Sequence, residues 1–216
     1  ESSLRLPFDE QILKEVQRVT TSIKTNTLQY VVVIGIGGSN LGTQAVYDAV
    51  AGSMNLLVDR LPKLLFLDTV SDEKMTAVTR TLERLPKKDD FAVILISKSG
   101  TTTETIVNTE VLWVFLQEHF GDPRSRFVAI TDEGSKLWNQ AGEKKITRLS
   151  IPSIIGGRYS VFNAVGLLPL FLSGINVDDL IDGAREAVQD NTNDDLTINT
   201  ALVSALITDH HRRAGR

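Results

Sequence analysis

The sequence predicts a doubly wound α/β fold, a three-layer sandwich with a parallel sheet of about five strands. Short apolar runs alternate with longer amphipathic stretches along the first two thirds of the chain. Within the runs the apolar residues are consecutive, which is typical of parallel strands that are covered on both faces. After residue 158 the strand signals stop, and only helical patterns follow.

The elements follow from local periodicity. A first helix over residues 7–24 is predicted by apolar residues at helical spacing, namely Phe8, Ile12, Val16, Val19 and Ile23. Strands are predicted at residues 30–34, 64–67, 91–96, 127–130 and 146–149. Helices are predicted at residues 40–50, 72–85, 102–120, 135–141, 160–172, 177–188 and 196–213. The α/β core thus occupies residues 28–150 of a single domain, 1–216, and helices over 160–213 complete it.

Composition excludes several classes of protein. The chain has 216 residues, no cysteine and a net charge of −4. The absence of cysteine excludes a disulfide scaffold, cysteine-ligated zinc, an iron–sulfur cluster and a cysteine nucleophile. The negative charge argues against a nucleic-acid partner, and no apolar run reaches the roughly 18 residues of a membrane span. We therefore expect a soluble, cytoplasmic protein that binds neither nucleic acid nor membrane.

The first glycine-rich segment, residues 35–42 (GIGGSNLG), directly follows the first predicted strand. Glycines let a backbone approach a ligand closely, and the helix that follows directs free N–H groups toward it. The dinucleotide fingerprint fails at Asn40 and the nucleophile elbow fails at Leu41, because each needs glycine there. The alternative is a tight strand–helix turn that Ser39 caps.

The second segment, residues 97–105 (SKSGTTTET), follows the third predicted strand and opens a helix. It gathers six hydroxyls, one lysine and one glycine, a set that suits a phosphate dianion at a helix N-terminus. The alternative is a capping turn with Thr101 or Thr102 as the cap. A cap needs one hydroxyl, so six favour phosphate binding.

The third segment, residues 156–160 (GGRYS), precedes a strongly apolar stretch. Two glycines can bring the guanidinium of Arg158 against an anion or a developing oxyanion. A permanently charged arginine is unsuited to act as a general base. The alternative is a helix N-terminus with Ser160 as the cap and Arg158 in solvent.

Other polar residues carry weaker signals. His119 closes a predicted helix and is interpreted as a surface residue. His210 and His211 lie in a basic tail without metal-ligand spacing. Asp68 ends the second predicted strand, where a nucleotide-binding fold would hold a ribose, but the glycine pattern of that fold is missing.

Taken in order, the three segments resemble those of bacterial glucose-6-phosphate isomerase (phosphoglucose isomerase). That family's motifs read GIGGSxLG, SKSGTTTE and GGRYSV…GLLP, and this chain has GIGGSNLG, SKSGTTTE and GGRYSVFNAVGLLPL at Gly35, Ser97 and Gly156. The match runs over residues 30–184. The resemblance implies that the chain corresponds to the family's first sugar-isomerase (SIS) domain, a five-stranded parallel α/β sandwich.

The resemblance also implies residue roles. Gly38 and Ser39 would contact the substrate beside its phosphate, and Arg158 would stabilise the enediolate intermediate. The phosphate loop would consist of Ser97, Lys98, Ser99, Gly100, Thr101 and Thr102. The implied reaction interconverts glucose 6-phosphate and fructose 6-phosphate, a step of glycolysis and gluconeogenesis, through a cis-enediolate. It needs no metal or organic cofactor, and the family is usually dimeric.

The chain departs from the family because it lacks the later motif QLxxESxGK, which carries the base glutamate, and the family's histidine and lysine. Glu104 and His210 are the only stand-ins for the base. We expect a fragment of a longer two-domain enzyme, and loss of a base costs roughly 10²–10⁴-fold in rate.

One alternative function is that of a stand-alone SIS module that senses a sugar phosphate, but Arg158 argues against it. The other, a nucleotide-binding domain, is disfavoured by Asn40.

Overall fold

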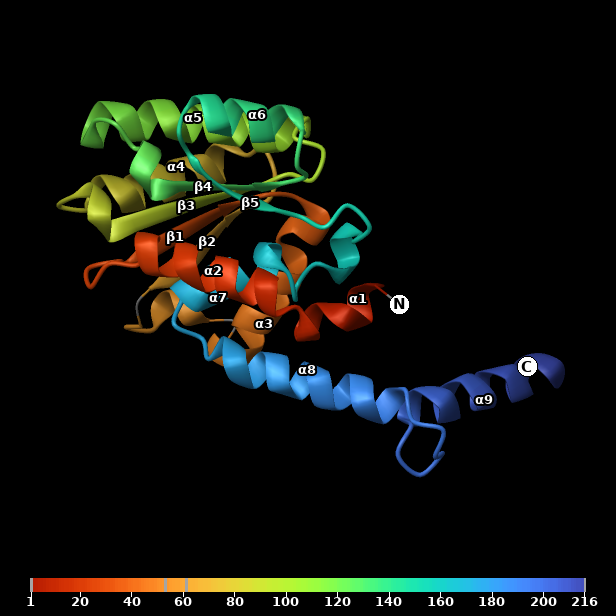
Figure 1. Ribbon diagram of the computed structural model, residues 1–216. Helices are drawn as coiled ribbons and strands as arrows, with labels where there is room; N and C mark the ends of the chain where they lie inside the picture. The colour runs from red at the N-terminus through yellow and green to blue at the C-terminus, as the bar shows by residue number, and fades with distance from the viewer. Residues whose placement is uncertain (1, 53, 61, 216) are drawn as a thin grey trace.

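The computed structural model describes residues 2–52, 54–60 and 62–215 and confirms the predicted fold class. Within these ranges, five parallel strands lie in the order β2-β1-β3-β4-β5, with helices on both faces of the sheet (Figure 1). Their bounds are β1 Tyr30–Ile34, β2 Lys63–Leu67, β3 Phe91–Ile96, β4 Phe127–Thr131 and β5 Thr147–Ser150. In the register of the central strands, Val32 of β1 lies opposite Leu65 of β2 and Val93 of β3.

The helices divide between the two faces of the sheet (Figure 1). One face carries α2 (Glu10–Ile23), α3 (Leu41–Ala51) and α7 (Ala164–Leu172), and α8 (Val177–Asn191) packs beside α7. The other face carries α4 (Asp72–Glu83), α5 (Thr103–Phe120) and α6 (Lys136–Glu143). Consecutive residues of a strand point to opposite faces, so Val31 and Val33 join the first core cluster while Val32 and Ile34 join the second.

The first long helix begins later than the periodicity predicts. The structure has a short helix α1 (Ser2–Arg5), a 3-10 turn (Leu6–Phe8) and then α2. The reason is Asp9, whose carboxylate accepts hydrogen bonds from the backbone N–H groups of Gln11 and Ile12, each at 3.1 Å. Because an aspartate is a strong N-cap, the continuous helix predicted from residue 7 is wrong at its start.

Two later helices also begin after their predicted starts. Helix α7 starts at Ala164 and not at Ser160, because Asn163 caps it by accepting from the N–H of Val165 at 2.8 Å. The predicted cap Ser160 is therefore wrong, and a separate 3-10 turn (Gly157–Tyr159) precedes it. Helix α9 (Thr200–Arg213) starts where Asn199 accepts from the N–H of Leu202, four residues beyond the predicted start.

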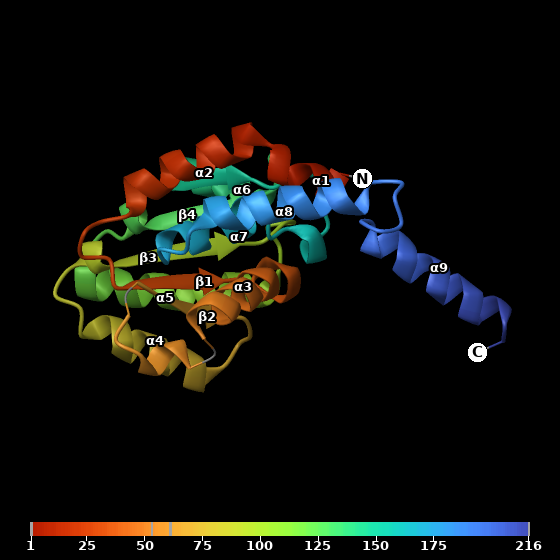
Figure 2. The same cartoon turned by 90° about the horizontal axis from the view of Figure 1, so that it is seen from below.

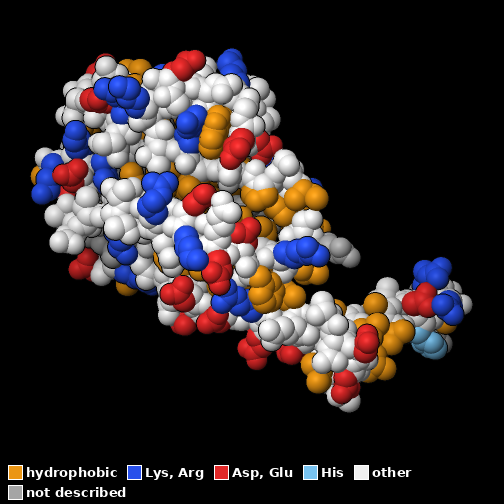
Figure 3. Space-filling model, viewed as in Figure 1, with side chains coloured by type: hydrophobic (Ala, Val, Ile, Leu, Met, Phe, Trp, Pro, Cys, Tyr) orange, Lys and Arg blue, Asp and Glu red, His pale blue; other side chains and the backbone are white. Residues whose placement is uncertain are grey.

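Helix α9 forms an arm that extends away from the sheet in both ribbon views (Figure 2). It has no buried residue among those described, and it contacts helix α8. Hydrophobic side chains are visible on the surface of this arm (Figure 3). Those about half exposed on the arm and in the turn before it are Leu196, Ile198, Leu206 and Ile207. Within the described parts of the chain, no helix is long and apolar enough to cross a bilayer.

Candidate functional site

The strand order places the candidate site where the topology reverses. Strand β1 lies between β2 and β3, so the loops that follow β1 and β3 leave neighbouring strands toward helices on opposite faces. Ligands of open α/β sheets bind at such a switch point, outside the carboxyl ends of the strands. The loop with Gly35 and the loop with Ser97 both start there. A Cβ atom on Gly35 would lie 3.1 Å from the carbonyl oxygen of Ile96.

The loop after β1 is shaped by its own backbone. Gly37 has φ of +55°, a left-handed conformation that favours glycine, and residues 37–39 form a 3-10 turn. Asn40 is 1% exposed, and its Nδ2 group donates to the carbonyl of Gly35 at 2.9 Å. Asn40 thus closes the loop and does not cap helix α3 through its side chain. The N-cap position belongs to Asn40, so the alternative in which Ser39 caps the helix is wrong.

The first and third segments meet directly. A Cβ atom on Gly38 would lie 2.2 Å from the carbonyl carbon of Gly157, so only glycine fits at position 38. The hydroxyl of Ser160 lies 2.9 Å from the carbonyl oxygen of Gly38 and 2.6 Å from that of Gly157, and it donates to this pair of acceptors. This bridge is a role of Ser160 that sequence reasoning missed, because its partner is distant in the chain.

Arg158 lies in the 3-10 turn beside this junction, with its side chain exposed. Among the described residues, its guanidinium has no carboxylate within ion-pair distance and no hydrogen bond. The arginine is therefore presented at the edge of the sheet with its donors available, which is the arrangement that an anionic ligand needs.

The loop after β3 is held by its hydroxyl groups. The hydroxyl of Ser97 donates to Thr102 Oγ1 at 3.1 Å and accepts from the N–H of Gly100 at 3.1 Å. The hydroxyls of Ser99 and Thr101 are 2.9 Å apart. Gly100 has φ of +69°, and a Cβ atom there would lie 2.7 Å from the backbone nitrogen of Leu137. The loop is therefore tightly packed at Gly100 and hydrogen-bonded elsewhere.

Helix α5 begins directly after this loop without a side-chain cap. Thr102 occupies the N-cap position, but neither its hydroxyl nor that of Thr101 accepts from the first turn. The predicted N-cap position of Thr102 is therefore confirmed, but the hydroxyl groups of Thr101 and Thr102 form no capping hydrogen bond. The first N–H groups of an 18-residue helix remain directed at the loop, and together with the positive end of the helix dipole they form a favourable environment for a phosphate.

Lys98 connects the second segment to the third. Its ammonium donates to the carbonyl oxygens of Ser153 at 2.5 Å and Ile155 at 2.9 Å, just before Gly156. The side chain thus holds the loop after β3 against the strand-to-turn connection that carries Arg158. Together, these contacts bring all three sequence-predicted segments to one edge of the sheet.

The weaker candidates lie elsewhere or are engaged. Asp68 forms an ion pair with Lys74, and His119 lies on the surface of α5 with Nδ1 2.9 Å from the carbonyl oxygen of Phe115. Glu104 is in the first turn of α5, next to the Ser97 loop. His210 lies on the arm formed by α9, away from the sheet (Figure 2). The described residues contain no group of three or more His, Asp or Glu that could hold a metal ion.

Comparison with protein families finds that the model of the phosphoglucose isomerase family matches residues 10–213. The chain is 33% identical over 207 residues to a glucose-6-phosphate isomerase of Staphylococcus epidermidis, covering 94% of this chain and 46% of that protein. It is 35% identical over 206 residues to that of Mycoplasma capricolum, with the same two shares. The chain therefore spans about half the length of the curated relatives it matches.

Solved structures agree with the sequence comparison. A hypothetical protein from Thermus thermophilus superposes with a TM-score of 0.82 at 32% identity, covering 98% of this chain and 48% of that one. A glucose-6-phosphate isomerase from Chlamydia trachomatis superposes with a TM-score of 0.65 at 24% identity, covering 88% of this chain and 33% of that one, and so shares the fold.

Proposed function

The chain belongs to the phosphoglucose isomerase family, and we propose that it supplies the phosphate-binding half and the enediolate-stabilising arginine of a glucose-6-phosphate isomerase. The observation that carries this proposal is the convergence of three segments at the β1–β3 edge, through the Gly38–Gly157 contact and the two carbonyl contacts of Lys98. A hexose 6-phosphate has one dianionic end and one reacting end, and this edge offers a separate group for each.

The phosphate is assigned to the loop after β3. Its hydroxyls, from Ser97, Ser99, Thr101 and Thr102, stand before the uncapped N-terminus of α5. Hydroxyl donors, backbone N–H groups and a helix dipole together suit a phosphate dianion better than any of them alone. Gly100 contributes through its left-handed backbone, which brings the loop close to α6.

The side chain of Lys98 is assigned a bracing role. Since its ammonium already contacts two carbonyl oxygens, it positions the Arg158 segment relative to the phosphate loop, and its backbone belongs to the loop itself. Gly38 and Ser39 then line the space between the phosphate and the reacting carbons. This assignment separates the groups that bind the phosphate from the group that positions the arginine.

Arg158 is assigned to the reacting end. During isomerisation a base removes the proton from C2, negative charge develops on the oxygens at C1 and C2, and the proton returns to C1. A planar guanidinium can donate two parallel hydrogen bonds to these two oxygens, and preorganised donors of this kind stabilise the charge as it forms. The base and the ring-opening acid are not assigned to residues of this chain.

The test of this proposal is calorimetric titration of the 216-residue chain with fructose 6-phosphate. We expect weak binding that Thr102→Ala weakens roughly ten- to a hundredfold, since a hydrogen bond to a charged group contributes about 1.5–3 kcal/mol. Thr81→Ala, on helix α4, is the matched control and should bind as the unchanged chain does. Absence of binding at millimolar ligand, or equal binding by Thr102→Ala, would refute the phosphate assignment.

A measurement of turnover provides a second test of the proposal. The purified chain should not interconvert glucose 6-phosphate and fructose 6-phosphate measurably, because a positioned base contributes roughly 10²–10⁴-fold. Isomerisation by the chain alone, abolished by Glu104→Gln, would show instead that Glu104 is the base and that the division of roles is wrong.

A further inference from the structure

A cavity of about 350 Å³ lies between helices α5 and α6, on the face of the sheet formed by β3 and β4. Its walls are mostly carbon, from residues such as Leu95, Ile106, Val114, Phe127 and Ala141. The cavity has the size and apolar character of a small-molecule site. It extends from the Ser97 loop along helices α5 and α6, and Arg158 does not line it, so the sugar-phosphate site does not account for most of it.

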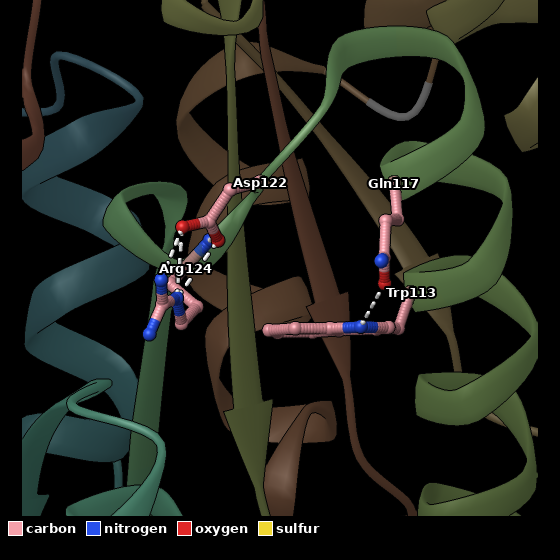
Figure 4. A network of polar contacts seen from close by, with 4 residues as sticks. All are labelled: Trp113, Gln117, Asp122 and Arg124. Carbon is pink, nitrogen blue, oxygen red and sulfur yellow. Dashed lines mark hydrogen bonds and ion pairs between the residues drawn. The ribbon is translucent and has the colours of Figure 1, made fainter.

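An aromatic side chain forms one wall. The ring of Trp113 lies 4.9 Å from the ring of Phe127, centroid to centroid, and both line the cavity. The indole N–H donates to Gln117 Oε1 at 3.0 Å, which fixes the orientation of the ring (Figure 4). A rigid aromatic wall favours a flat ligand that stacks on it.

Two of the polar groups that line the cavity bear on its ligand. Thr105 is 2% exposed and lies in its wall, and Thr105 Oγ1 has no hydrogen-bond partner among the described residues. Buried hydroxyls are nearly always paired, so this one indicates a missing partner. Lys144 lines the cavity on the side of α6, with its ammonium 5.1 Å from the centre of the Trp113 ring.

The charged side chains that line the cavity restrict the chemical class of its ligand further. Lys144 would attract a single anionic group carried by a ligand that stacks on Trp113. Glu110 lines the same cavity and would repel a second negative charge, which makes phosphate dianions poor occupants. The polyhydroxyl body of a sugar would also lose its hydrogen bonds against the apolar walls.

The cavity shares residues with the phosphate loop. Ser97 and Gly100 line it, and a Cβ atom on Gly100 would lie 2.7 Å from the backbone nitrogen of Leu137, another lining residue. A ligand that separates α5 from α6 would move Leu137 relative to Gly100. Because the two backbones approach closely at this point, a shift of one displaces the other.

We propose that this cavity binds a flat aromatic ligand with one anionic group, and that its occupation weakens the binding of sugar phosphate at the Ser97 loop. The inhibition rests on the proposed function, whereas the binding of the aromatic ligand does not. The site is then an inhibitory one, in which coupling passes through Leu137 and Gly100.

The test of the site uses 1-anilinonaphthalene-8-sulfonate, an aromatic monoanion with a flat naphthalene ring, with fluorescence excited through tryptophan. We expect saturable binding that Ala141→Leu weakens at least tenfold by filling the cavity and that Lys144→Ala weakens about fivefold. Lys87→Ala removes an exposed lysine at the other end of the strands, before β3, and should change nothing. Thr105→Val, which keeps the shape and removes the hydroxyl, should weaken binding about threefold.

The arm provides the control for nonspecific apolar binding, because Leu206 on α9 is about half exposed. Binding that Leu206→Ala reduces and Ala141→Leu leaves unchanged would overturn the site.

For the coupling, saturating fructose 6-phosphate should raise the Kd of the probe about fivefold, and the probe should raise the Kd of fructose 6-phosphate by the same factor. A probe Kd that fructose 6-phosphate leaves unchanged, although each ligand binds alone, would overturn the coupling. If fructose 6-phosphate does not bind even when no probe is present, the proposed function is refuted. The cavity variants would still show whether the probe binds in the cavity.

Discussion

The two loops that leave β1 and β3 serve one edge of the sheet, but they are built differently. The loop after β1 depends on close backbone packing, since Gly38 faces Gly157 with no room for a side chain. The loop after β3 depends on hydroxyl groups that hydrogen-bond to one another, with Gly100 as the one tight point. The first loop can therefore fix the position of Arg158, whereas the second can exchange its internal hydrogen bonds for those of a ligand.

We expect the largest effect from a substitution that disrupts the backbone-packed loop after β1. Gly38→Ala places Cβ 2.2 Å from the carbonyl carbon of Gly157, and overpacking of this kind costs about 1–3 kcal/mol or more. We expect a clear fall in the thermal unfolding temperature together with loss of fructose 6-phosphate binding. Gly157→Ala is the matched control, because its Cβ would lie 3.4 Å from Gly38 Cα, an ordinary contact. Equal unfolding temperatures for both variants would contradict the packing argument.

The next effect concerns the tight point of the hydroxyl-rich loop. Gly100→Ala combines a left-handed φ of +69° with a contact of 2.7 Å to the nitrogen of Leu137. Gly134→Ala has a left-handed φ of +78° but nothing within 4 Å among the described residues, so it isolates the conformational strain, about 1 kcal/mol. Measured by urea unfolding, Gly100→Ala should cost more than Gly134→Ala. Of the two variants, only Gly100→Ala should weaken sugar-phosphate binding.

A smaller effect tests the connection between the two loops. Lys98→Met removes two hydrogen bonds from the ammonium to Ser153 and Ile155, in a half-buried position, and should lower the free energy of unfolding by about 1–2 kcal/mol. Fructose 6-phosphate should still bind, with a Kd raised less than tenfold. A Kd raised a hundredfold at unchanged stability would show that Lys98 contacts the phosphate directly and would remove its bracing role.

The smallest effect lies away from both loops, before β4. Arg124 hydrogen-bonds to Asp122 and lowers the pKa of that carboxyl to about 2 (Figure 4). Because the pKa is depressed in the folded state, the pair stabilises the protein above the usual pKa near 3.8, and this contribution disappears as the pH falls toward about 2.

Asp122→Asn should therefore reduce stability slightly at neutral pH and match the unchanged chain near pH 2, as urea unfolding across this range would show. Sugar-phosphate binding should be unaffected, and a variant that weakens it would contradict the separation of this ion pair from the site.

Much of the fold could be predicted because its signals are local. All six residues of β3 are buried, so consecutive apolar residues identify a central parallel strand without knowledge of its neighbours. Periodicity places the starts of α2, α7 and α9 too early, because side-chain caps from Asp9, Asn163 and Asn199 outweigh the apolar pattern that continues through them.

The parallel α/β class and the three segments rich in glycine, hydroxyl groups and arginine follow from the sequence, because runs and motifs are properties of neighbouring residues. How the segments meet follows from the packing of the folded chain. Ser160 and Gly38 lie 122 residues apart in the chain, yet one hydroxyl holds the two loops together. That contact, the bracing position of Lys98 and the cavity between α5 and α6 depend on how the layers pack. Packing joins atoms that are close in space, and no local pattern records which atoms those are.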